Sequence, residues 1–95
     1  MKVDQINACI KQLGSSTGFQ IFLCLARAGK MTVSLITEYL NQPQPLISYY
    51  LLRMKSCGLL SSESEGVYKL YFVNKETVRE VIAFLSNVID KKADN

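Results

Sequence analysis

The sequence of 95 residues contains no histidine and only three cysteines. The absence of histidine removes the commonest general base and the commonest transition-metal ligand. Cys9, Cys24 and Cys57 lie far apart and form no Cys-x-x-Cys pair, so we expect reduced, mostly buried thiols. Gly-rich phosphate loops, Gly-x-Ser-x-Gly turns and motif-placed carboxylate pairs are also missing. These absences argue against an enzyme and against a metal or other cofactor.

Long apolar runs are absent as well. The longest, Ile21 to Ala26, has six residues, whereas a membrane-spanning helix needs about 20. The N-terminal residues turn polar at once and contain no apolar signal-peptide core. We therefore expect a cytoplasmic protein with no membrane partner.

What is present indicates one folded domain over residues 1–95. Hydrophobic residues make up 48% of the chain and charged residues 20%, which excludes general disorder. The net charge of +3 is compatible with a polyanionic partner without indicating one. Because a chain of this length buries only about 60–65% of its unfolded surface, a dimer interface would add useful apolar burial.

Apolar periodicity predicts helices along the first part of the chain. Apolar residues recur at helical spacing from Val3 to Leu13, and a second helix follows from about Thr17 to Ala28. Gly29 is suited to end this second helix. Thr32 can cap a short third helix that reaches Leu40. Pro45 suits the first turn of a fourth helix, which Gly58 ends.

The second part of the chain begins with a hairpin pattern. Strand-forming runs at Leu59–Ser62 and Val67–Val73 are joined by a turn at Glu63–Gly66. Asn74 can then cap a last helix that reaches about Ile89. The predicted fold is mainly α with a small β-hairpin, in the order α-α-α-α-β-β-α. This is a winged helix-turn-helix, with the helix-turn-helix at about 32–57 and the wing at about 59–73.

One segment carries a family resemblance. Gln44-Pro-Leu-Ile-Ser-Tyr-Tyr-Leu51, followed by Cys57-Gly-Leu-Leu60, resembles the ArsR/SmtB family of bacterial winged-helix regulators across the recognition helix and first wing strand. The resemblance implies a DNA-binding regulator of transcription. The chain departs from the family pattern at several positions: Ser15 to Phe19 replace an arginine-containing turn, Pro43 replaces a capping serine, and Tyr50 replaces a histidine.

The resemblance also implies metal sensing, but we do not expect it in this chain. The positions of the family's third-helix Cys-x-Cys motif are Thr32 and Ser34, and the last-helix site requires histidines. Glu76, Glu80 and Asp90 are explained more simply by a solvated helix face.

The helix that begins near Gln44 is the predicted DNA reader. If Ile47, Leu51 and Met54 face the core, the opposite surface offers groups suited to the major groove and to phosphates. We predict DNA contacts from Gln44, Leu46, Ser48, Tyr49 and Arg53. A solvated role for Arg53 and packing of Tyr49 against a partner remain alternatives.

The wing carries less evidence for DNA contact. Lys69 is its one predicted DNA-binding residue, while Glu63 and Glu65 would repel phosphates near the tip. A hairpin that only completes the core is an equal alternative.

The first and last helices, at about 3–13 and 75–90, are the predicted homodimer surface. Their apolar stripes exceed what one small core requires. The predicted interface residues are Val3, Ile6, Ile10, Leu13, Val78, Ile82, Leu85 and Ile89. Packing of both helices on their own core is the alternative. A symmetric dimer would hold two recognition helices about 34 Å apart.

Three functions are consistent with these features. The first is a homodimer that binds specific double-stranded DNA and represses transcription without a metal sensor. The second is a TubR-type centromere-binding adaptor of a plasmid or phage partition system, which binds DNA repeats and recruits a filament-forming, tubulin-like GTPase. The third is a winged helix used for protein–protein contact. A redox link through Cys9, which lies beside the first-helix stripe, also remains open.

Overall fold

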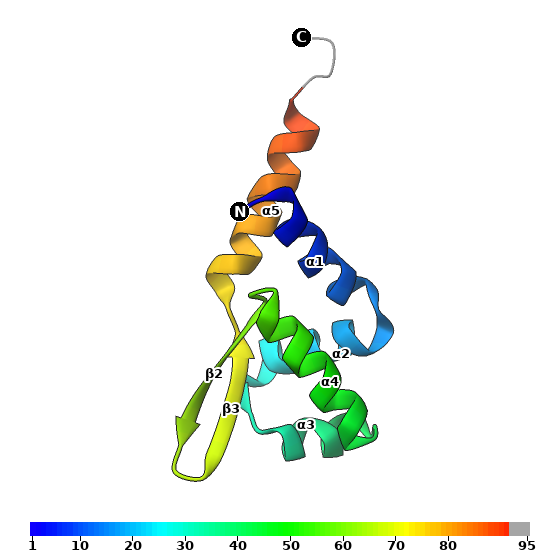
Figure 1. Ribbon diagram of the computed structural model, residues 1–95, viewed down its shortest axis with the longest axis vertical. Helices are drawn as coiled ribbons and strands as arrows, with labels where there is room; N and C mark the ends of the chain where they lie inside the picture. The colour runs from blue at the N-terminus through cyan, green and yellow to red at the C-terminus, as the bar shows by residue number, and fades with distance from the viewer. Residues whose placement is uncertain (92–95) are drawn as a thin grey trace.

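The computed structural model describes residues 1–91, which form helices and a small three-stranded sheet (Figure 1). The elements are α1 (Val3–Gly14), α2 (Ser16–Ala28), β1 (Lys30–Met31), α3 (Val33–Leu40), α4 (Gln44–Ser56), β2 (Leu60–Glu65), β3 (Tyr68–Val73) and α5 (Lys75–Asp90). This order confirms the mainly helical winged helix-turn-helix. None of the described helices is long and apolar enough to cross a membrane.

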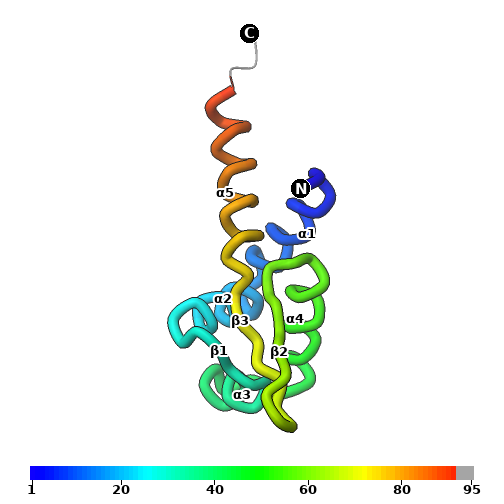
Figure 2. Tube along the Cα trace, turned by 90° about the vertical axis from the view of Figure 1, so that its left-hand side faces the viewer, coloured from blue at the N-terminus to red at the C-terminus, as the bar shows by residue number. Residues whose placement is uncertain are grey.

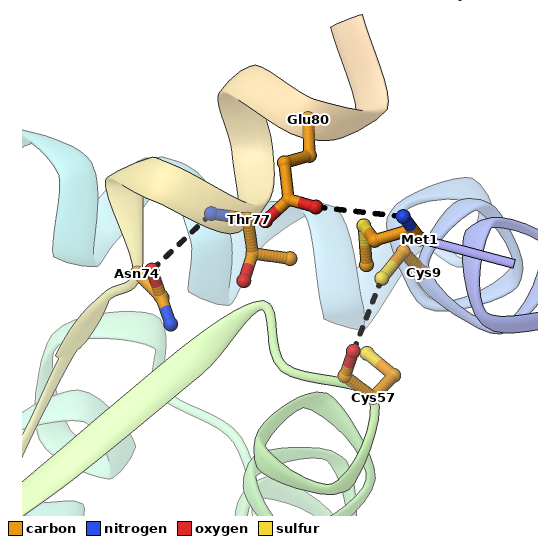
Figure 3. Close-up of polar contacts among 6 residues, drawn as sticks. All are labelled: Met1, Cys9, Cys57, Asn74, Thr77 and Glu80. Atoms are coloured by element: carbon orange, nitrogen blue, oxygen red, sulfur yellow. Dashed lines mark hydrogen bonds and ion pairs between the residues drawn. The ribbon is translucent and has the colours of Figure 1, made fainter. Parts of the chain in front are cut away.

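Short polar side chains set where three of the helices begin. The hydroxyl of Ser15 accepts the amide N–H of Gly18 at 2.9 Å, which starts α2 slightly before the predicted Thr17. The Thr32 hydroxyl accepts a backbone N–H in the first turn of α3 at 3.2 Å. Asn74 does the same for the N–H of Thr77 in α5, also at 3.2 Å (Figure 3). The caps predicted at Thr32 and Asn74 are therefore confirmed.

The wing contains a strand that the sequence pattern does not predict. The sheet order is β1-β3-β2, and all of its pairs are antiparallel. In β1, Lys30 pairs with Phe72 and Met31 with Tyr71, which fastens the chain before α3 to the wing (Figure 2). Two residues are too short for an alternating pattern, so only the partner strand defines β1.

The predicted hairpin turn at Glu63–Gly66 is wrong. Glu63 pairs with Leu70 and Glu65 with Tyr68, so β2 continues through all three residues before Gly66. The turn is Gly66 followed by Val67, and Gly66 adopts φ +61°, a conformation that suits glycine in two-residue hairpins. Serine and glutamate have weak strand preference, but pairing along β3 outweighs it.

The core lies where α1, α2, α3 and α4 meet the base of the sheet. Its fully buried centre comes from all four helices, from the first residue of β2 and from the residue before it: Cys9, Ile21, Leu25, Ile36, Ile47, Leu51, Met54, Leu59 and Leu60. By contrast, the last turns of α5 extend past this body (Figures 1 and 2).

All three cysteines are free and buried, as predicted. The Cys9 thiol donates to the carbonyl oxygen of Cys57 at 3.3 Å (Figure 3), and the Cys57 thiol donates to that of Met54 at 3.3 Å. Burial, with a smaller effect of the Cys57 thiol, raises the pKa of Cys9 to about 12. Burial likewise raises the pKa of Cys24. Cys9 thus faces the core of its own chain as a protonated thiol rather than a second chain.

A close backbone approach at the start of α2 predicts a sharp glycine requirement. A Cβ at Gly18 would clash with the carbonyl oxygen of Gln12, whereas a Cβ at Gly14 would meet nothing within 4 Å. We expect Gly18→Ala to lower the free energy of unfolding by about 1–3 kcal/mol, because α1 and α2 must move apart. Gly14→Ala, the matched control, should leave it unchanged or raise it by up to about 1 kcal/mol. Urea denaturation measures both, and equal midpoints would contradict the prediction.

Candidate nucleic-acid interface

Helix α4 begins without a side-chain cap. The N-cap residue is Pro43, whose carbonyl oxygen accepts the amide N–H groups of Leu46 at 3.1 Å and Ile47 at 3.2 Å. Pro45 occupies the first turn, as predicted. The Gln44 side chain makes no capping hydrogen bond, so it stays available at the positive end of the helix dipole.

The two faces of α4 differ as the sequence predicts. Ile47, Leu51 and Met54 are almost completely buried and fix the rotation of the helix. On the opposite side the structure exposes four of the five predicted α4 DNA contacts, and the fifth, Leu46, is half-buried. The exposed four are Gln44, Ser48, Tyr49 and Arg53. Their contact with DNA remains a prediction.

Two of these side chains contact each other. The guanidinium carbon of Arg53 lies 5.3 Å from the ring centre of Tyr49, one helical turn away. Tyr50 packs edge-on against Tyr49, with ring centres 5.3 Å apart, and is itself half-buried. Arg53 and Tyr50 thus hold the Tyr49 ring between a cation and a second aromatic ring. These contacts restrict the rotamers of Tyr49 and leave the side chain exposed.

The structure adds two residues to this face that the sequence analysis missed. Leu52 is 70% exposed on the outer side of α4. Lys55 is also exposed, and its ammonium group donates to the hydroxyl of Ser62 on β2 at 2.7 Å. The helical period does point both outward, since they follow Ser48 by four and seven positions. A leucine next to a core leucine is itself typical of a core position, so the sequence pattern does not single out Leu52.

The wing is less acidic at its tip than expected. The Glu63 carboxylate forms an ion pair with the Lys30 ammonium at 2.9 Å, and both side chains are about half exposed. Only Glu65 adjoins the turn, where Val67 is 93% exposed. Lys69 is exposed on β3 opposite Ser64. These positions leave Lys69 accessible, and its contact with DNA stays a prediction.

Helices α1 and α5 share an apolar surface. Between them lies a cleft of about 330 Å³ lined almost entirely by apolar side chains, among them Ile10, Leu13, Val78, Ile82 and Leu85. Exposed apolar residues continue this surface at the two helix ends, at Val3, Val88 and Ile89.

One predicted interface residue does not belong to this surface. Ile6 is 2% exposed and packs in the core of its own chain, on the inner side of α1 with Cys9. The apolar residues of α1 cover more of the helix circumference than the core contacts. Ile6 therefore packs in the core, while Val3 and Ile10 remain exposed. Leu13 and Val78 lie between the core and the exposed surface, and both are half-buried against the core.

Two residues that were candidates for metal binding make other contacts in the structure. Thr32 caps α3, and Glu80 lies 3.7 Å from the terminal amino group of Met1 (Figure 3). Within residues 1–91, no group of three or more histidine, cysteine or acidic residues is placed to hold a metal ion.

Known proteins match this chain in both sequence and structure. The family described as bacterial regulatory protein, arsR family, matches residues 15–62. An uncharacterised HTH-type transcriptional regulator of Methanocaldococcus jannaschii is 30% identical over 92% of this chain and 98% of its own length. The transcriptional repressor SdpR of Bacillus subtilis is 29% identical over 90% and 94%.

A solved structure extends this similarity to the fold. A winged helix-turn-helix DNA-binding domain of Mycobacterium bovis, homodimeric in solution, is 27% identical with a TM-score of 0.74. The match covers 93% of this chain and 81% of that one. Because the family match spans just over half of the sequence and the M. jannaschii relative aligns with nearly all of it, the chain belongs to the arsR family of bacterial regulatory proteins.

Proposed function

We propose that this protein is a homodimeric transcriptional repressor that binds specific double-stranded DNA through the exposed face of α4 and has no metal sensor. The observation that carries the proposal is the composition of that face. It presents an amide, a hydroxyl and a phenol at Gln44, Ser48 and Tyr49, beside the cation of Arg53. Amides and hydroxyls read base edges in the major groove, and arginine binds phosphates or guanine.

The charge pattern supports DNA as the partner. No aspartate or glutamate occurs between Glu38 and Glu63, so α4 carries only positive charges, at Arg53 and Lys55. A phosphate backbone beside this helix therefore meets no carboxylate from it. Lys69 is the corresponding cation on the wing.

Relatives and the apolar surface support the homodimer and the repressor role. The M. bovis domain is homodimeric, and SdpR is a repressor. In this chain the α1–α5 surface supplies apolar area for a two-fold interface, through the exposed Val3, Ile10, Ile82, Leu85 and Ile89 and the half-buried Leu13 and Val78. Such a dimer presents two α4 helices to two half-sites of a pseudo-palindrome.

The centromere-adaptor alternative has no independent support. Its distinguishing requirement is a filament-forming GTPase partner, and the relatives that the chain matches are named for transcriptional regulation. We therefore propose a cytoplasmic repressor acting near its own gene rather than a partition adaptor. Footprints over many tandem repeats would reverse this preference.

Fluorescence anisotropy with labelled duplexes from the region upstream of the gene tests the proposal. We expect saturable binding to one duplex at least about a thousandfold tighter than to random duplex at physiological salt. Affinity should fall steeply with salt concentration because bound phosphates release counter-ions. Zinc, cadmium or arsenite should leave it unchanged. Absence of saturable binding, or binding indifferent to salt, would overturn the proposal.

A further inference from the structure

A small cleft lies between the end of α1 and the middle of α4. It has a volume of about 100 Å³, and Lys11 from α1 and Arg53 from α4 both line it. Tyr49 and Ser15 form other parts of its wall. We call it the Lys11–Arg53 cleft. It brings a cation from outside the helix-turn-helix next to the proposed DNA-reading face.

The surroundings of this cleft carry no negative charge. The sequence has no acidic residue between Asp4 and Glu38, so the second half of α1 and all of α2 lack carboxylates, as α4 does. Within residues 1–91, the two ion pairs use Met1 with Glu80 and Lys30 with Glu63. Lys11 and Arg53 are both exposed and have no counter-ion among the described residues. Two such cations that line one cleft raise the local potential for an anion.

Two further features of the cleft favour binding of an anion. The Arg53 guanidinium packs on the Tyr49 ring at 5.3 Å, which restricts the arginine before any ligand arrives. Ser15 is the N-cap of α2, a helix of 13 residues, so the positive end of that helix dipole adjoins the same cleft. The cleft, with a volume of about 100 Å³, has room for a compact group such as a single phosphate.

We propose that Lys11 and Arg53 together bind one phosphate of the DNA backbone, so that α1 takes part directly in DNA binding. This inference rests on the proposed DNA-binding function and adds a residue that lies outside the helix-turn-helix. The shared phosphate would be close to the bases read by Tyr49 and would set the position of α4 in the groove. A phosphate contact of this kind strengthens binding to every sequence equally.

Substitution of Lys11 tests the proposal. We expect Lys11→Gln to weaken binding about fivefold to both specific and random duplex and to reduce the slope of log affinity against log salt by up to about one. Lys2→Gln makes the same charge change at the other end of α1 and should have little effect. Lys11→Arg should retain binding. In the double variant Lys11→Gln/Arg53→Gln, the loss should be smaller than the product of the single losses, because both side chains bind one phosphate.

Lysine acetylation followed by mass spectrometry reports the contact itself. Bound duplex should protect Lys11 and leave Lys2 reactive, and it should protect Lys11 more strongly than inorganic phosphate does at the same ionic strength. Equal losses from Lys11→Gln and Lys2→Gln, in a protein whose wild type binds DNA, would overturn this inference and leave the proposed function intact. Fully multiplicative losses in the double variant, or protection of Lys11 by inorganic phosphate as strong as that by duplex, would also overturn it. A wild type that binds no DNA would overturn both.

Discussion

Replacing both Ser48 and Tyr49 with alanine is expected to weaken binding to the specific duplex by roughly a hundredfold while leaving the dimer intact. Each side chain that reads a base contributes about 1–3 kcal/mol of discrimination, and both residues lie on the exposed face of α4. Tyr49→Ala also removes the ring on which Arg53 packs. Anisotropy with specific and random duplexes measures the ratio of the two affinities, which should fall by roughly a hundredfold.

A matched control lies on the other helix of the motif. Ser34 and Tyr39 are both exposed on α3, so their double alanine variant removes the same chemical groups from a neighbouring surface. It should leave the ratio of specific to random binding unchanged. Tyr49→Phe separates the packing of the ring against Arg53 from the proposed contact of the hydroxyl with DNA, because it keeps the ring and removes only the hydroxyl. An unchanged ratio in the Ser48 and Tyr49 variant would show that α4 does not read the bases.

Leu85→Glu is expected to convert the dimer into a monomer. Leu85 is 45% exposed and lines the apolar cleft between α1 and α5. A two-fold interface would bury two unpaired carboxylates, at a cost of several kcal/mol each. We expect the dimer dissociation constant to rise about a thousandfold by analytical ultracentrifugation. DNA affinity should fall about a hundredfold, because one half-site then binds without the linked second.

Leu35→Glu provides the control for this substitution. Leu35 on α3 is 51% exposed, so the same change is made at a similar exposure but away from α1 and α5. This variant should remain dimeric. If Leu85→Glu keeps the circular dichroism spectrum of the wild type and still sediments as a dimer, the α1–α5 surface is not the interface.

The predicted elements agree best with the structure where their cause is local. The caps at Thr32 and Asn74 and the helix stop at Gly29 depend on a few adjacent residues, and each lies where the sequence indicates. Strand β1 and the end of β2 depend instead on pairing with β3, whose partners are distant in sequence. Their residues carry little strand preference of their own, so no local pattern predicts them.

The candidate site divides in the same way. The rotation of α4 follows from its buried stripe, and this correctly exposes Gln44, Ser48, Tyr49 and Arg53. The half-burial of Leu46 and the burial of Ile6 depend on what packs beside each helix, which periodicity cannot resolve. The neutralisation of Glu63 by Lys30 joins residues 33 positions apart and likewise requires the folded sheet.

By itself, the sequence determined the fold class, the order of the long helices and which side of α4 is exposed. Apolar period, caps and glycine stops act within one or two turns, so they can be read from neighbouring residues. Only the tertiary structure decided the third strand, the ion pair of Glu63 near the wing tip and the cleft that Lys11 and Arg53 both line. These depend on contacts between distant segments, which form only when the core has fixed the helices and sheet relative to one another.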